Sequence, residues 1–158
     1  MSRTHRVSES LIIPYTRDIA WRAGNDPRPL SVHVPMLKRF RIEGRMKEGA
    51  RVTEIHTALG FPQHFEGFIT AYEPGFHWAM FTRPVTWGPA SLPHSADYRF
   101  EYLPDAAGTR VSIACEYELK GLLRLPCAGW ITAFLMRTTI RRLLHAIEKR
   151  AARLSLSH

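Results

Sequence analysis

Apolar and polar residues alternate with a period of two through much of the chain, and this pattern predicts β-strands. The clearest case is 109–120, where Val111, Ile113 and Leu119 share one face and Ser112 and Glu116 lie on the other. Such alternation is typical of an antiparallel strand with one buried and one solvated face. Less regular patterns of the same kind predict further strands at 6–13, 38–44, 51–59, 63–73, 76–83 and 96–103.

Short segments rich in Gly, Pro and Asp separate these predicted strands, as expected for connections between antiparallel neighbours. They lie at 46–49, 60–62, 74–75 and 104–108, and the one long loop is at 84–93. Pro14 can open a helix at its first turn, so 15–23 is predicted to be a short helix. The three prolines of 25–35 predict a loop or a broken helix.

The last segment, 126–154, has a helical period instead. Its apolar residues fall within about a third of a turn at roughly 100° per residue, and most of its basic residues lie opposite. We expect Leu143 and Ile147 to be buried against the sheet. The order of elements predicts an α+β fold of a single domain, 1–158. A curved seven-stranded antiparallel sheet wraps around the long C-terminal helix, and short helices follow the first strand.

Several segments match, in order, those of a known superfamily. They are 10–14 with 19–21, the glycine turn 47–51, the proline turn 72–76, 108–111 with 119–121, and the terminal helix 126–154. On these segments the chain resembles the START-like (SRPBCC) superfamily, especially its polyketide cyclase/dehydrase and lipid-transport branch. Their order over nearly the whole chain carries the resemblance.

The resemblance implies a helix-grip fold with an apolar cavity between the sheet and the last helix. It implies binding of a hydrophobic or amphipathic small molecule, so a carrier or sensor is the first hypothesis. The alternative is an enzyme of the cyclase/dehydratase type acting on an aromatic or polyketide-like substrate. No catalytic residue can be carried over from a motif, so the non-enzymatic hypothesis is preferred, and no cofactor is expected.

The alternation of side chains between the two faces of each strand, together with the resemblance, identifies candidate residues of the cavity wall. A tyrosine among them either belongs to an aromatic core or donates a hydrogen bond to a ligand. The candidate ligand-binding residues are Phe40, Trp78, Met80, Tyr98, Phe100, Tyr102, Cys115, Tyr117 and Phe134.

Glu54 and His56 share one face of the strand predicted at 51–59. Both faces of this strand mix polar and apolar residues, so periodicity does not decide which face points inward. An inward pair could act as an acid and base or hold a ligand head group. Burying these groups unpaired would be costly, and the outward, solvated orientation is therefore preferred.

Motifs for other chemistry are missing from the sequence. The eight histidines and two cysteines form no HExxH or close Cys/His pattern, so no metal site is expected. There is no G-x-S-x-G motif and no glycine-rich phosphate loop that opens a helix. Two cysteines do not make a disulfide framework, which fits a reduced, cytoplasmic compartment.

The basic character of the chain is concentrated in its last quarter. The net charge is +8, and 120–158 holds eight basic residues and one acidic residue, a net +7. A solvated helix face is the preferred explanation, a weak contact with an anionic membrane is the alternative, and nucleic acid is an unlikely partner.

Four large apolar residues at the start of the last helix share the side that arginines occupy further along. They are Trp130, Ile131, Phe134 and Leu135. They are either covered by the loop 84–93 or the loop around Pro35, or they form an exposed patch. An exposed patch would suit a homodimer contact or insertion at a lipid interface.

Overall fold

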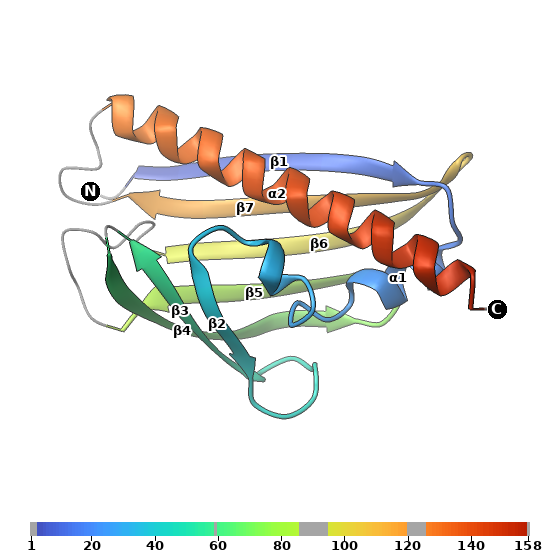
Figure 1. Ribbon diagram of the computed structural model, residues 1–158, viewed down its shortest axis with the longest axis horizontal. Helices are drawn as coiled ribbons and strands as arrows, with labels where there is room; N and C mark the ends of the chain where they lie inside the picture. The colour runs from blue at the N-terminus through green and yellow to red at the C-terminus, as the bar shows by residue number, and fades with distance from the viewer. Residues whose placement is uncertain (1–2, 59, 86–94, 120–125, 158) are drawn as a thin grey trace.

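A computed structural model describes residues 3–58, 60–85, 95–119 and 126–157 of the chain (Figure 1). The strands are β1 (Arg3–Ile13), β2 (Leu37–Ile42), β3 (Arg51–Ala58), β4 (Phe61–Glu73), β5 (His77–Pro84), β6 (Ser95–Asp105) and β7 (Gly108–Leu119). The helical elements are α1 (Arg17–Gly24), the short 3-10 helix η1 (Ser31–His33) and α2 (Pro126–Ser155). The predicted α+β helix-grip architecture is confirmed.

All seven described strands belong to one antiparallel sheet, in the order β1-β7-β6-β5-β4-β3-β2. The first strand therefore pairs with the last, with Val7 opposite Cys115. Register shifts at Leu37/Arg39 in β2 and at Ile69/Ala71 in β4 bend the strands where they occur. In Figure 1, α2 runs diagonally across β1, β7 and β6, while β2 and β3 cross the other strands at an angle.

The core lies between the inner face of the sheet and α2. The alternating residues of β7, from Val111 to Leu119, are buried on this face, as the sequence pattern predicts. Leu143 and Ile147 of α2 are also buried, and that prediction is confirmed. The strand parity and the helical stripe thus identify the two surfaces that form the core.

Gly67 marks a close approach of two strands. A Cβ atom at this position would overlap the carbonyl oxygen of Phe81, which belongs to the neighbouring strand β5. Gly67 pairs with Thr82 in the register of β4 and β5. Only a residue without a side chain allows the backbones to lie this close.

The boundaries of several elements differ slightly from those expected. The first helix begins at Arg17 rather than at residue 15, because Thr16 is extended and serves as its N-cap. The segment 25–36 is broken as its prolines predict, and it contains the single turn η1. Residues 86–93 of the predicted long loop, and the expected strand ends at 59 and 120, lie outside the described residues.

Candidate ligand-binding site

A small pocket lies between the inner face of the sheet, the segment 25–36 and the middle of α2. Its volume is about 40 Å³, which leaves room for a few water molecules. Its apolar lining consists of Pro27, Leu30, Val34, Leu37, Phe40, Met80, Phe100 and Leu143. Its polar lining consists of Ser31, Glu54, His56, Tyr98 and Thr139.

The pocket brings together six of the residues singled out from the sequence. Phe40 comes from β2, Glu54 and His56 from β3, Met80 from β5, and Tyr98 and Phe100 from β6. Trp78, Tyr102, Cys115 and Tyr117 are buried on the same face of the sheet but do not line the pocket. Phe134 lies apart from it, because its side chain is 60% exposed on α2. Whether the six bind a ligand stays a prediction.

Trp78 does not line the pocket itself but packs against Phe100, which does. Its ring stacks on Phe100, with 3.9 Å between ring centroids and an angle of 10° between the ring planes. Its indole N–H donates a hydrogen bond of 2.9 Å to the carbonyl of Gly24, at the end of α1. Trp78 therefore ties α1 to the sheet and holds Phe100 in place, a structural role rather than a contact with the pocket.

Glu54 and His56 form a hydrogen-bonded pair at the edge of the pocket. His56 Nε2 lies 2.9 Å from Glu54 Oε2, and Glu54 is only 6% exposed. The outward orientation preferred from the sequence is therefore wrong for Glu54. The reason is that the imidazole satisfies the carboxylate, so that the cost of burying it unpaired does not arise. The rings of His56 and of Phe65 from β4 meet in a T-shaped contact, with 5.0 Å between their centroids.

The hydrogen bond also limits where the hydrogens of the pair can lie. When the carboxylate is ionised it can only accept, and Nε2 of His56 is then the donor. In neutral His56, Nδ1 is then the nitrogen with a free lone pair. This nitrogen can accept a hydrogen bond or take a proton.

Tyr98 brings a phenol to the same end of the pocket. Burial raises the pKa of Tyr98 well above its usual value, and its interactions with the neighbouring Cys115 and Glu54 side chains raise it further. Burial likewise raises the pKa of the Cys115 thiol, the neighbour of Tyr98 across β6 and β7. Both groups stay protonated at neutral pH, and neither is a nucleophile there.

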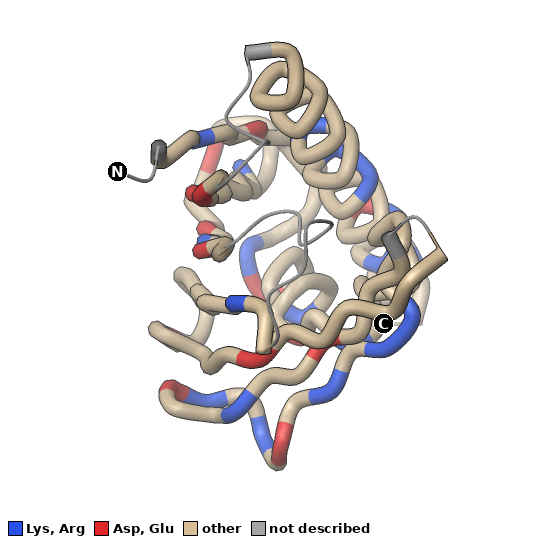
Figure 2. Tube along the Cα trace, turned by 90° about the vertical axis from the view of Figure 1, so that its left-hand side faces the viewer, with Lys and Arg blue, Asp and Glu red and all other residues tan. Residues whose placement is uncertain are grey.

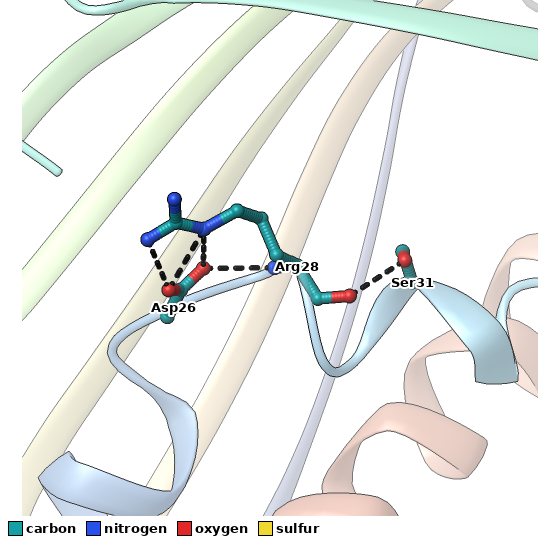
Figure 3. Close-up of polar contacts among 3 residues, drawn as sticks. All are labelled: Asp26, Arg28 and Ser31. Carbon is teal, nitrogen blue, oxygen red and sulfur yellow. Dashed lines mark hydrogen bonds and ion pairs between the residues drawn. The ribbon is translucent and has the colours of Figure 1, made fainter. Parts of the chain in front are cut away.

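The segment 25–36 forms the wall opposite β3, and local polar contacts fix its shape (Figure 3). Arg28 donates hydrogen bonds from its guanidinium group and its backbone N–H to the Asp26 carboxylate. The Ser31 hydroxyl donates a hydrogen bond of 2.7 Å to the carbonyl oxygen of Arg28. These contacts hold Pro27 and Leu30 over the pocket.

The charge state of Asp26 depends on the same contacts. Burial acts to raise the pKa of Asp26, but the hydrogen bonds from Arg28 and the positive charges of Arg28 and Arg150 outweigh it. The pKa of Asp26 therefore lies below its usual value. The sequence Asp-Pro-Arg-Pro at 26–29 contains the signal for this turn, because an Asp side chain commonly accepts a hydrogen bond from the backbone two residues on.

Two further observations bear on the chemistry of the core. In the described part of the chain, no three His, Cys, Asp or Glu side chains gather closely enough to hold a metal ion. The hydroxyl groups of Tyr102 and Tyr117 are buried and have no hydrogen-bond partner among the described residues. The hydroxyl of Tyr102 fills the space left by the missing side chain of Gly24, which is a packing role. The structure places neither hydroxyl in the pocket.

Comparison by sequence finds neither a matching family model nor a matching curated protein. Solved structures do match over nearly the whole chain. The protein TTHA0849 from Thermus thermophilus is 18% identical, with a TM-score of 0.71, and the match covers 97% of this chain and 99% of that one.

Two enzymes have the same architecture. The ZhuI aromatase/cyclase from Streptomyces sp. R1128 is 12% identical, with a TM-score of 0.67 and coverage of 96% of this chain and 95% of that one. Norcoclaurine synthase from Thalictrum flavum, solved with dopamine and hydroxybenzaldehyde, is 16% identical with a TM-score of 0.67. That match covers 99% of this chain and 89% of the synthase. The chain therefore has the helix-grip fold of these structures, which is the fold that its resemblance to the START-like (SRPBCC) superfamily implies.

Proposed function

We propose that this chain binds a compact amphipathic molecule in the pocket under segment 25–36. The apolar part of the molecule lies against Met80, Phe100 and Leu143, and its polar group faces the Glu54–His56 pair. The observation that carries this proposal is the hydrogen-bonded pair of the buried Glu54 carboxylate and the partly buried His56 imidazole, set in a mainly apolar wall. A few polar groups in an apolar pocket are what fixes the orientation of a small ligand.

The size of the pocket limits the ligand. Its volume of about 40 Å³ is well below the roughly 300–1,000 Å³ usual for pockets that hold drug-sized molecules. A larger ligand requires the segment 25–36 to move outward, because Pro27, Leu30 and Val34 form that wall. The hydrogen bonds of Arg28 with Asp26 lie within the segment, so it can move as one piece.

Binding of a small aromatic carbonyl compound tests the proposal. A hydroxybenzaldehyde is a suitable probe, because it is compact and the norcoclaurine synthase structure of the same fold holds one. We expect His56→Leu to weaken its binding roughly 2–12-fold, the range for losing one hydrogen bond. His64→Leu, which changes a histidine outside the pocket, is the matched control. No saturable binding by the wild type, or equal binding by all three proteins, would contradict the proposal.

Native mass spectrometry of the purified protein supplies a second test without a chosen probe. We expect an apolar or amphipathic molecule to be retained by the wild type and released on denaturation. Val34→Trp, which fills the pocket from a partly buried position of its wall, should abolish retention while the fold persists by circular dichroism. Retention that is unchanged in this variant would place the ligand elsewhere.

A second candidate function is acid–base catalysis of the cyclase/dehydratase type by the same pair. The orientation of Glu54 toward the pocket favours it, because the hydrogen bond to Nε2 prepares Nδ1 of His56 to take a proton. The ZhuI aromatase/cyclase shares the fold and so lends this candidate support. A carbon acid next to a carbonyl group is the substrate class that such a base would serve.

Hydrogen exchange distinguishes this candidate from simple binding. 2-Tetralone is a compact aromatic ketone whose α-hydrogens can be replaced by deuterium, and its exchange in buffer without protein gives the solution rate. Catalysis predicts faster exchange with the wild type and exchange at the solution rate with His56→Gln. If the wild type binds hydroxybenzaldehyde but leaves the exchange rate unchanged, the catalytic candidate fails while ligand binding stands.

A further inference from the structure

Four large apolar side chains are exposed together on the first turns of α2. Trp130, Ile131, Phe134 and Leu135 are 72%, 50%, 60% and 48% exposed, and we call them the apolar patch. The rings of Trp130 and Phe134 lie nearly parallel, with 6.2 Å between centroids. The spacing i, i+1, i+4 and i+5 places all four on one side of the helix. Water thus meets a continuous apolar surface here, not isolated side chains.

Arginines continue the same side of α2 beyond the patch. Arg137, Arg141 and Arg142 are exposed and follow within the next two turns. At roughly 100° per residue, their positions around the helix fall within or near the arc that the apolar patch occupies. The helix has no acidic residue before Glu148, and Figure 2 shows blue positions along α2 beyond an uncharged beginning. Arg141 reaches Glu9 of β1 at 3.1 Å.

We propose that this side of α2 docks on an anionic lipid surface. The apolar patch enters the interface, and the arginines meet the lipid phosphates. Amphipathic helices with aromatic and basic residues bind the bilayer interface in this way, without crossing it. Trp130 suits the depth of the headgroups, because its ring is apolar while its N–H remains a donor. None of the described helices is long and apolar enough to cross a membrane.

Charge favours a lipid surface over a second copy of the chain. A symmetric dimer through the apolar patch would cover the apolar side chains, but α2 would offer the arginines of the other copy no acidic partner before Glu148. An anionic lipid surface instead satisfies the arginines and the apolar patch at once. A nucleic acid would match the arginines but would leave Ile131 and Leu135 in water.

The docked helix would also lie over the pocket. Thr139 and Leu143 line the pocket from the opposite side of α2. The helix is about 10–12 Å thick with its side chains, so the pocket wall would lie about that far from the lipid. A ligand that partitions into membranes would then be concentrated beside its site.

Co-sedimentation with vesicles tests the proposal. The vesicles are phosphatidylcholine with or without phosphatidylserine, and binding is expected only to those that contain phosphatidylserine. Binding should weaken with salt, because the Debye length falls from about 10 Å at 0.1 M to about 3 Å at 1 M. Arg142→Gln should lower the partition coefficient roughly fivefold. Lys47→Gln, an exposed basic residue in the turn before β3, is the matched control.

A second set of variants tests the contribution of the apolar patch to vesicle binding. Phe134→Ala should weaken vesicle binding, whereas Phe68→Ala should not, because Phe68 is an exposed aromatic residue on β4 rather than on α2. Tryptophan emission should shift to the blue on binding, and the shift should be lost in Trp130→Ala. Melting temperatures confirm that each variant is folded.

Four results would overturn the proposal, the last two of which identify another partner. The first is an absence of vesicle binding at low salt. The second is equal binding by Phe134→Ala and the wild type, which would place the contact on another basic surface. The third is a dimer in sedimentation that Phe134→Ala converts to monomer. The fourth is retention by DNA without retention by vesicles.

Discussion

The Glu54 carboxylate and the His56 imidazole lie 2.9 Å apart on neighbouring same-face positions of β3, at the edge of the pocket. The side chains support each other. The imidazole gives the buried carboxylate a hydrogen-bond partner, and the carboxylate holds the imidazole ring through Nε2. A carboxylate in this position costs the fold stability if it loses its partner.

A double-mutant cycle therefore measures the coupling of this pair. We expect His56→Leu to lower the free energy of unfolding by about 1–3 kcal/mol, because it leaves Glu54 buried and unpaired. The double variant Glu54→Leu/His56→Leu should be less destabilised than the sum of the two single variants. Urea unfolding at neutral pH provides the measurement. Strict additivity would mean that the two side chains do not interact in solution.

Leu143 of α2 is buried in the core and also lines the pocket. We expect Leu143→Ala to cost about 2–5 kcal/mol of unfolding free energy, since it removes a buried side chain and leaves a cavity. Ile131→Ala is the control on the same helix, and its half-exposed side chain should cost no more than about 0.5 kcal/mol. Equal melting temperatures for the two variants would show that α2 does not pack on the sheet through Leu143.

Gly67 has to remain without a side chain. We expect Gly67→Ala to destabilise the protein by about 1–3 kcal/mol or more, because the new methyl group meets the backbone of β5 rather than a side chain that can move. Gly129→Ala offers the contrast, since its nearest neighbour, His5, would lie at an ordinary 3.5 Å. That change should be neutral or stabilise α2 by up to about 1 kcal/mol. Thermal unfolding of both variants decides the comparison.

The ionisation of Asp26 makes the stability of segment 25–36 depend on pH. The pKa of Asp26 is lowered in the folded protein, so its contribution is present above its usual pKa of 3.8 and is lost as the pH falls toward the folded value. Asp26→Asn should therefore be less stable than the wild type at pH 6, and the difference should shrink below pH 3.8. Arg28→Gln should reduce the same pH dependence. If the two unfolding curves stay parallel down to the lowest pH, the Asp26–Arg28 contact does not form.

Regular alternation made much of the sheet predictable. Tyr98, Phe100 and Tyr102 alternate with charged residues, and only one orientation buries three aromatic rings. The apolar stripe of α2 is equally unambiguous, because Leu143 and Ile147 are separated by one turn. In both cases one face is so much more apolar than the other that burial has a single solution.

The pocket was harder to predict, for three reasons. β3 carries polar residues on both faces, and the sequence does not reveal that Glu54 is placed opposite Phe40 and Phe65 and points inward. Segment 25–36 has no period, and its prolines indicate a break without indicating that it covers the sheet. Phe134 lies roughly 130° around α2 from the centre of its buried stripe, so the helical period argues against a place in the wall.

The position of β1 at the edge of the sheet sets an order of events during synthesis. β1 pairs along its whole length with β7, so Ile13 meets Thr109 and Arg3 meets Leu119. At a translation rate of about 5–20 residues per second, the first strand waits roughly 5–20 s before its partner has been made. Its apolar residues remain unpaired for that time, and pairing over so great a sequence separation is slow. We therefore expect the nascent chain to depend on chaperones more than a helical protein of the same length.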